Sequence, residues 1–396
     1  AMNVTFLRHC RVLLAATVQT LTLLSLPATA AEPDAQQTQA LHALFDRQWE
    51  WSARTYPEFA TYRGDNRFGD RLSDVSAGAI AARDAEVAAF LADARALQRS
   101  KLGPTDRVSL DLFIDAQQRQ AETAAFPAAR GMTLRALGGP QTQFAELLQV
   151  MPTARADQVE QMLSRMAAFP RRMEQEMAII RRSAEAGWMP PRDVLERVLV
   201  QIDTQLIDPD ATPYYQPFKR LGSGIPAAER EALQQRGKTA IETQVMPPMR
   251  ALRVLVATEL MPRAGTDGAL KNAPEGAKIY NILVRQQTTT DLSAGEIHAI
   301  GLRELARLRA QMEAVMRETK FEGDFPDFVK FLNTDPRFFY TSAEALLAGY
   351  RDIAKRLDAE MPKLFAELPR APYGVQAMPV HMGNRAEYYN GPALDG

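Results

Sequence analysis

The sequence predicts an all-α fold, a mainly helical bundle with a short β-strand region near residues 373–390. Apolar residues recur at three- and four-residue spacings through most of the chain, as they do on the buried face of a helix. Dipeptides that contain glycine or proline interrupt this pattern often, which is typical of short connections between helices. The alternation of apolar and polar residues that indicates strands is scarce before residue 373.

The first expected elements are helices within residues 38–60 and 77–97. The earlier segment, TQALHALFDRQWEWSARTYPEFA, has one apolar stripe and otherwise polar faces, and the later segment is rich in alanine, the best helix former. Thr105 is expected to cap a helix that runs through Phe113, because a threonine hydroxyl accepts a hydrogen bond from the first turn. Further along, the sequence MPP at residues 246–248 predicts a break between helices.

The clearest helix is predicted for residues 293–318. Ser293 and Glu296 have the spacing of a capping box, in which the hydroxyl binds a backbone N–H group and the carboxylate reaches back. Thr341 and Glu344 repeat this spacing at the start of a helix in SAEALLAGYRDIAKRLDAEM. The segment between these helices, FPDFVKFLNTDPRFFY, predicts a short helix and a proline-bounded turn with exposed aromatic residues.

Residues 1–30 predict a secretory signal peptide. A basic patch at residues 8–11 precedes a largely apolar run at residues 12–26, and Ala28 and Ala30 form an A-x-A cleavage site. The alternative is a membrane anchor, but the apolar run is shorter than the roughly 20 residues needed to cross a bilayer. We therefore expect no stable membrane anchor and a mature protein that is periplasmic or secreted.

Charge balance and cysteine content exclude several classes of function. The chain has 47 basic and 48 acidic residues, a formal net charge of -1, and no basic stripe interleaved with aromatic residues, so no nucleic-acid partner is expected. Cys10 is the only cysteine and lies in the expected signal peptide. Thiol catalysis and cysteine metal sites are therefore not expected in the mature chain.

The residues of the mature chain do not form a recognisable catalytic motif. His42, His298 and His381 are isolated in the sequence, whereas a helical zinc site needs ligands that converge from one face. His298 is expected to lie on a helix face and to bond a neighbour. Neither G-x-S-x-G nor a phosphate-binding glycine loop is present. The residues alone therefore predict an exported helical protein that carries no complete set of catalytic residues.

Several ordered motifs resemble a known family. They are PEGAKIYNILVRQQTTTDLSAGEIHAIGLREL at residues 274–305, DPRFFY at residues 335–340 and LPRAPYGV at residues 368–375. Together they closely resemble the DUF885 family of bacterial, often exported, helical proteins related to zinc metallopeptidases of the carboxypeptidase Taq and gluzincin kind. The passage TYPEFATYRGDNRFGDRLSD at residues 55–74 resembles the opening region of the same family.

The resemblance implies a bowl-shaped helical fold with a deep cleft and a zinc-dependent hydrolase activity on peptide or amide bonds. In such proteins a His-Glu motif and a later acidic residue hold the metal, and this sequence contains neither. Residues 31–396 are therefore expected to be the N-terminal helical part, with the catalytic C-terminal part absent. Zinc is expected for the full-length family but not bound by this chain, which is expected to be inactive alone because metal-activated water and its glutamate base are both missing.

A second reading of the chain is a non-catalytic helical protein, either a peptide-binding module or a decayed enzyme. In either case the expected partner is a peptide or a small amide compound. The strands expected at residues 373–390 would be uncovered, and uncovered strand edges favour aggregation or dimerisation.

The resemblance also indicates residues that could line the cleft. An arginine could pair with a substrate carboxylate, and a tyrosine or histidine could donate a hydrogen bond to the oxyanion of a tetrahedral intermediate. The alternative for each residue is simple packing or a place on a solvated helix face. No catalytic residue and no metal ligand is predicted. The candidate substrate-binding residues are Arg385, Tyr388, Tyr389, His381, Tyr280, Arg285 and Arg337.

Overall fold

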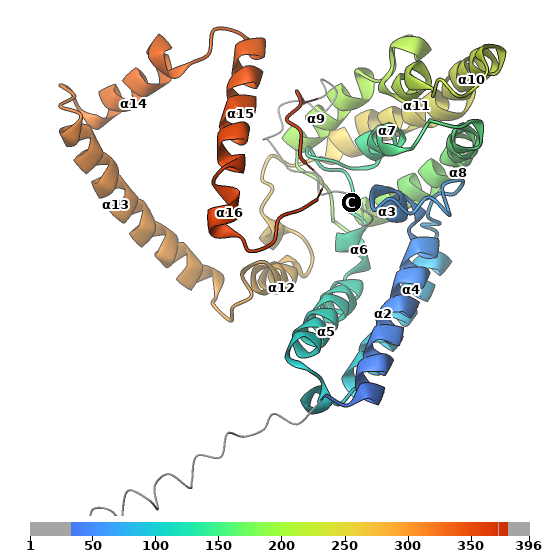
Figure 1. Cartoon of the computed structure of the whole chain (residues 1–396), viewed down its shortest axis with the longest axis horizontal. Helices are drawn as coiled ribbons and strands as arrows, with labels where there is room; N and C mark the ends of the chain where they lie inside the picture. Colours follow the sequence, from blue (N-terminus) through green and yellow to red (C-terminus); the bar gives the residue numbers. More distant parts are fainter. Residues whose placement is uncertain (1–32, 371, 379–396) are drawn as a thin grey trace, which may run out of the picture. The chain divides into compact units, whose positions relative to one another are not determined.

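The computed structural model describes residues 33–370 and 372–378, and within these residues the protein is helical and contains no strand. The all-α prediction is therefore confirmed (Figure 1). The α-helices in chain order are α2 (Ala35–Thr55), α3 (Pro57–Tyr62), α4 (Ala77–Ala96), α5 (Pro104–Ala124), α6 (Pro127–Arg130), α7 (Pro140–Val150), α8 (Ala156–Glu185), α9 (Arg192–Asp203), α10 (Ala227–Ala240), α11 (Met246–Val254), α12 (Gly276–Thr288), α13 (Ala294–Glu318), α14 (Phe325–Thr334), α15 (Ala343–Asp358) and α16 (Met361–Leu364).

The strand region predicted near residues 373–390 is wrong for its described part, residues 373–378, which contains no strand. This segment bonds to α15 instead of to another extended segment. The Tyr373 hydroxyl donates to the Ala354 carbonyl oxygen at 3.0 Å, and Arg351 Nε donates to the Val375 carbonyl oxygen at 3.1 Å. The rest of the predicted strand region lies outside the described residues.

The chain divides into two compact units, Ala1–Gln48 with Ala88–Gln118 and Trp49–Val87 with Arg119–Gly396. The smaller unit includes the first part of α2, the last part of α4 and most of α5. The larger unit contains the rest of these three helices, including Glu122 at the end of α5, together with α3 and every helix from α6 to α16, so it carries most of the features discussed below.

The smaller unit has a modest apolar centre. Leu41, Phe90 and Leu110 are each at most 1% exposed, and the rings of Phe45 and Phe113 lie 5.3 Å apart. These side chains come from three different helices, and Leu41 and Phe45 belong to the apolar stripe predicted for the first helix. The prediction of that amphipathic helix is therefore confirmed.

The start of α5 differs from its prediction. The helix begins at Pro104, whose fixed backbone φ suits a first helical position, so Thr105 lies inside the first turn and the predicted threonine cap is wrong. The negative charge of Asp106 in the same turn interacts favourably with the positive end of the helix dipole. Its Oδ1 atom also lies 3.1 Å from His42 Nε2. An acidic side chain thus occupies the helix start without a hydroxyl cap.

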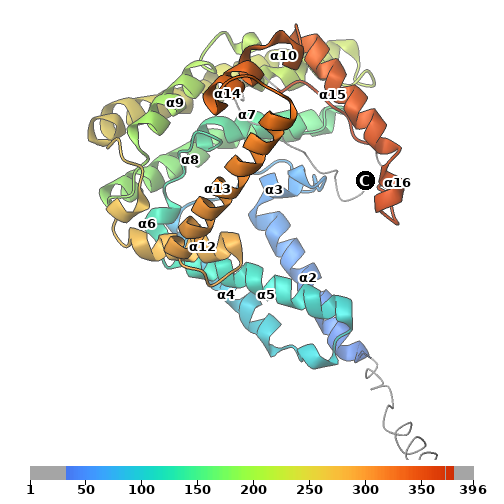
Figure 2. The same cartoon turned by 90° about the vertical axis from the view of Figure 1, so that its left-hand side faces the viewer.

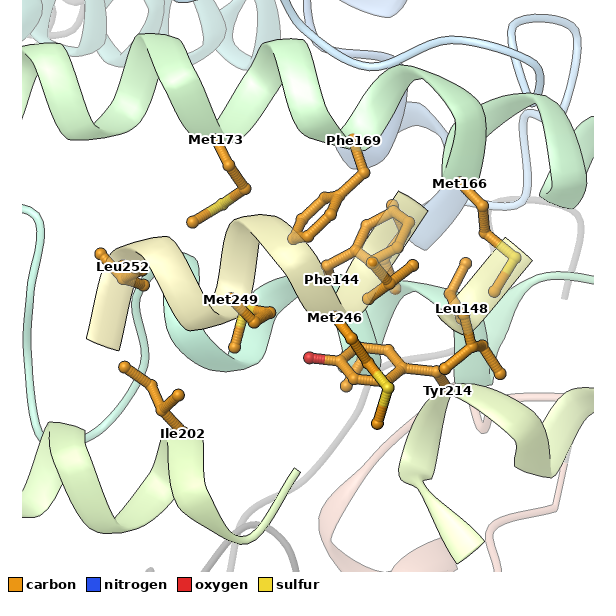
Figure 3. Close-up of a cluster of buried hydrophobic side chains, with 14 of the residues drawn as sticks. Phe144, Leu148, Met166, Phe169, Met173, Ile202, Tyr214, Met246, Met249 and Leu252 are labelled. Carbon is orange, nitrogen blue, oxygen red and sulfur yellow. The ribbon is translucent and has the colours of Figure 1, made fainter. Parts of the chain in front are cut away.

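The core of the larger unit lies among α7, α8, α9 and α11 (Figure 3). Phe144 of α7 and Phe169 of α8 stack with ring centroids 4.1 Å apart, and Met173, Met246 and Met249 are at most 4% exposed beside them. Burying each such side chain contributes about 1.5–3 kcal/mol relative to an exposed one. This contiguous core makes the α7–α11 region the rigid centre of the unit.

The sequence MPP at residues 246–248 does not end a helix, contrary to prediction. A π-helical stretch, Ile241–Val245, connects α10 directly to α11, and a second one, Leu255–Leu260, follows α11. Proline lacks a backbone N–H group, and it is tolerated in the first turn of a helix, where that group would have no intrahelical partner. Because the π-helical turn interrupts the α-helical hydrogen-bond pattern just before the prolines, the helical path continues through them.

Helices α13 and α15 can be followed in Figure 2. Their caps are largely as predicted. Glu296 N donates to Ser293 Oγ at 3.3 Å, and Ser293 N donates to Glu296 Oε2 at 2.8 Å, so the capping box is confirmed. In α15 the cap is Ser342, whose hydroxyl accepts from Ala345 N at 3.1 Å, so the prediction of Thr341 is wrong by one residue. Neither α13 nor α15 contains a buried residue.

Candidate functional site

The candidate site is an apolar groove between α13, α14 and the short 3-10 helix η8 (Pro336–Phe338) of the larger unit. Its volume is about 800 Å³. Most of its lining is apolar or aromatic, as in sites that bind apolar side chains. The lining residues are Leu308, Gln311, Met312, Val315, Thr319, Lys320, Phe321, Glu322, Phe328, Phe331, Leu332, Arg337 and Phe338.

A cluster of aromatic rings forms one wall of the groove. The rings of Phe321 and Phe328 have centroids 5.1 Å apart, Phe321 and Phe331 lie at 5.2 Å, and Phe331 meets Phe338 edge to face at 5.4 Å. Phe328 is only 6% exposed and anchors the cluster. Offset and edge-to-face contacts of this kind are favourable beyond the apolar area that they bury.

The turn between α13 and α14 positions these rings. Gly323 adopts φ +144, and a Cβ atom there would lie 2.9 Å from the Phe321 ring, so only glycine fits this conformation. Asp324 then caps α14 by accepting from Asp327 N at 2.9 Å. On the other side, the Arg309 guanidinium lies 3.5 Å from the Phe325 ring centroid and joins α13 to α14.

Arg337 is the predicted binding residue that the structure places in the groove. Its Nε and Nη2 atoms donate to the two carboxylate oxygens of Asp335, each at 2.9 Å. Its guanidinium lies 5.4 Å from the Phe331 ring centroid and 5.8 Å from that of Phe338. The hydrogen bonds from Arg337 lower the pKa of the Asp335 carboxyl, so this pair is ionised at neutral pH. A polar group thus stands at the edge of an aromatic wall.

The other predicted binding residues do not join Arg337. Tyr280 of α12 is 46% exposed and does not line the groove. Arg285 Nη2 donates to Glu122 Oε2 at 2.7 Å, so this arginine holds α12 against α5. His381, Arg385, Tyr388 and Tyr389 lie outside the described residues. Among the described candidates, Arg337 alone lines the groove, and the binding roles of the others stay predictions.

The described residues do not fit a zinc ion. Among them, no three His, Cys, Asp or Glu side chains are grouped closely enough to hold a metal. His42 contacts Asp106, and His298 lies exposed on α13. The groove itself contains only Lys320, Glu322 and Arg337 as charged residues, and this set includes no histidine.

Sequence reasoning missed a buried arginine on α8. Arg165 is 0% exposed and donates to backbone carbonyl oxygens, from Nε to Arg71 in the segment after α3 at 2.8 Å and from Nη2 to Pro57 in α3 at 3.0 Å. Nη2 also donates to the Thr61 hydroxyl at 2.9 Å. Burial lowers the pKa of Arg165 to about 10. A charged residue between the buried Met162 and Met166 is the sequence signal that could have revealed it.

A second arginine of α8 extends this attachment. Arg172 donates to Glu58 Oε1 at 2.9 Å and to Glu176 Oε1 at 2.8 Å, and the Glu58 carboxylate accepts from the Ser73 backbone N–H group at 2.9 Å. The polar face of α8 thus fixes residues 57–73, a segment within the passage that resembles the opening region of the DUF885 family.

The chain matches one protein family over most of its length. A family described as "Bacterial protein of unknown function (DUF885)" matches residues 57–396. No curated protein matches the chain. Within the part of the chain that the structure describes, no helix has the length and apolar character needed to span a membrane.

Two solved structures share the fold. One is described as a "putative lipoprotein" from Colwellia psychrerythraea, with 17% identity and a TM-score of 0.81 over 91% of this chain. The other is described as a "putative lipoprotein of unknown function" from Shewanella oneidensis, with 16% identity and a TM-score of 0.57 over 92% of this chain. The chain spans 66% of the length of each of these proteins.

Proposed function

The chain belongs to the DUF885 family, and from this membership we propose that it forms the helical N-terminal part of an exported zinc-dependent hydrolase that cleaves peptide or amide bonds. In this proposal the metal ligands lie outside the described residues, because the described residues do not fit zinc. The chain supplies the helical scaffold, and the catalytic centre belongs to polypeptide that the longer relatives have in addition.

The observation that carries this proposal is the ordered set of family motifs combined with the length of the relatives. The motifs resemble the helical part of gluzincin-like peptidases, and the chain spans only 66% of the solved relatives. Export is supported by the leader pattern of residues 1–30 and by the description of both relatives as lipoproteins. Periplasmic location or secretion after cleavage of the leader is part of the proposal.

The proposal is tested by following the reading frame beyond codon 396 and by measuring zinc and hydrolysis. We expect a His-Glu motif within a few dozen codons, one zinc per longer protein, and hydrolysis of a general peptide substrate that a chelator abolishes. The 396-residue chain should bind no stoichiometric zinc and should lack this activity. A stop codon directly after Gly396 in related strains, or one equivalent of zinc in the 396-residue chain, would contradict the proposal.

A second candidate function is the capture of a peptide without catalysis. The observation in its favour is the aromatic groove of about 800 Å³, whose edge carries Arg337. A peptide with a bulky apolar side chain and a carboxylate would suit this lining. Titration calorimetry with a phenylalanine-terminated peptide tests this function, and binding by the parent protein that the Phe331→Ala variant loses would support it.

A further inference from the structure

We propose that α13 and α15 present an intramolecular docking surface, and that its occupant is the additional polypeptide of longer DUF885 proteins. This proposal rests on the proposed function in one respect, that the chain forms the N-terminal part of a longer fold. It assigns the apolar groove beside α13 to internal packing, and in this respect it is the alternative to the peptide capture described as the second candidate function.

Two apolar stripes define this docking surface, which we call the seam. Their members recur at alternating three- and four-residue steps, so each stripe lies along one side of its helix. The seam consists of Leu305 (66% exposed), Leu308 (47%), Met312 (44%) and Val315 (51%) in α13, and of Leu346 (44%), Tyr350 (43%), Ile353 (47%) and Leu357 (53%) in α15.

The exposure of the seam is unusual for this protein. The corresponding stripe of α8 is almost fully buried, with Val159, Met162 and Met166 at 0% exposure. Contiguous apolar surface of this kind in a folded protein marks a contact with another polypeptide or with a ligand. The groove continues the α13 stripe, because Leu308, Met312 and Val315 also line it. The α13 stripe and the groove are therefore parts of one uncovered apolar face, and the α15 stripe is a second apolar surface.

The length of a solved relative supplies the occupant for this face. The Colwellia structure matches 91% of this chain, and the unmatched part of the chain is too short to contain α13 to α16 together. The same structure is longer, since the match covers 66% of it. Helices equivalent to much of this region therefore occur in a fold that also contains additional polypeptide.

The charges beside the seam favour an apolar partner. Arg307 Nε donates to Glu304 at 2.8 Å, and Arg309 Nε donates to Glu313 at 2.6 Å, so these charges are paired within α13. These two pairs leave the charges of this stretch of α13 less available to a highly charged partner. A helix or loop with apolar residues on one face matches this surface, as in other helix-in-groove contacts.

Hydrogen exchange in the longer protein tests the proposal. The backbone amides of α13 and α15 should exchange at least about tenfold more slowly in the longer protein than in the 396-residue chain, because covered helices open less often. Leu305→Glu and Ile353→Glu should remove this protection, since each puts a charge into the seam. Circular dichroism of the same variants in the 396-residue chain shows whether they still fold.

The controls are Ala310→Glu and Ala348→Glu, which add the same charge to exposed positions of α13 and α15 outside the seam. They should leave the protection unchanged. Equal exchange of α13 and α15 in both proteins would overturn the proposal, and so would a seam-dependent dimer of the longer protein seen by ultracentrifugation. If the longer protein binds no zinc and hydrolyses no peptide while α13 and α15 remain protected from exchange, that result contradicts the proposed function alone.

Discussion

The α7–α11 region and the α13–α15 region share the same helical pattern of apolar residues, but those residues are buried in the first region and largely exposed in the second. Both consist of amphipathic helices with apolar residues at three- and four-residue spacings. In the first region α7, α8, α9 and α11 bury those residues in one core, whereas in the second neither α13 nor α15 buries a single residue. The comparison teaches that helical periodicity specifies an apolar face but does not specify what covers it.

The largest expected difference between the two regions comes from the same substitution made in each. Leu148→Ala in α7 should lower the free energy of unfolding by about 3 kcal/mol, because it leaves a cavity at a side chain that is 0% exposed. Leu305→Ala in α13, at 66% exposure, should change it by less than about 0.5 kcal/mol. Urea unfolding of both variants provides the measurement. Equal effects would show that α13 belongs to the same cooperative core.

A smaller effect is expected at the buried arginine of α8. Arg165→Met should lower the free energy of unfolding by about 2 kcal/mol, because carbonyl oxygens of α3 and of the segment after it lose their buried donor. Arg171→Met on the same helix is the matched control, since that side chain is 76% exposed and pairs with Asp74. Hydrogen exchange should show the loss of protection in residues 57–73. If both variants unfold at the same urea concentration, the attachment by Arg165 is unimportant for stability.

The hydrogen bond of the Tyr214 hydroxyl should contribute about 1 kcal/mol to the free energy of unfolding. Tyr214 is 1% exposed and donates to Gln205 Oε1 at 2.8 Å, and burial raises the pKa of its phenol. Tyr214→Phe removes this bond and leaves a buried amide oxygen without that donor. Tyr215→Phe, which keeps the ring stacked on Phe218, is the control. Thermal unfolding that shows no difference between the two variants would argue against a role for the hydroxyl.

The smallest expected effect is local to the start of α13 and depends on pH. The Ser293 hydroxyl, followed by the Ser293 backbone N–H group, lowers the pKa of the Glu296 carboxyl. A carboxyl whose pKa is lower in the folded state stabilises that state above its unfolded pKa of about 4.3 and loses this contribution as the pH falls through the folded value. The first turn of α13 should therefore lose protection from hydrogen exchange on acidification. The midpoint of global unfolding should not depend on this cap, because the core determines it.

Ser293→Ala is the control for this pH dependence. The variant lacks the capping hydroxyl, so its first turn should already be weakly protected at neutral pH and should respond less to acid. Exchange rates corrected for the intrinsic effect of pH give the comparison. Identical pH profiles in parent and variant would show that Glu296 does not act through this cap.

Sequence patterns predicted those structural features well that depend only on residues close together in the chain. The capping box of Ser293 and Glu296 forms as expected, because it needs only residues within one turn. Thr105 and Thr341 are not caps because a neighbouring residue defines the first turn in each case, Pro104 for α5 and Ser342 for α15. The break expected at residues 246–248 fails because a π-helical turn precedes the prolines.

The candidate site was less predictable from the sequence. Arg337 was named as a binding residue, but its ring partners Phe331 and Phe338 and the groove itself depend on how α14 folds back on α13. Arg285 was also named, and its pairing with Glu122 joins residues far apart in the chain. Spacing within a motif cannot reveal such partners, since they come from separate helices.

The sequence by itself determined the helices, their apolar faces and the membership of the DUF885 family, because each depends on local spacing or on ordered motifs. Only the tertiary structure decided that Arg165 is buried against backbone carbonyl oxygens and that the stripes of α13 and α15 stay exposed. The physical reason is that burial depends on contacts between segments distant in sequence, whereas helix periodicity depends on neighbours within a few residues.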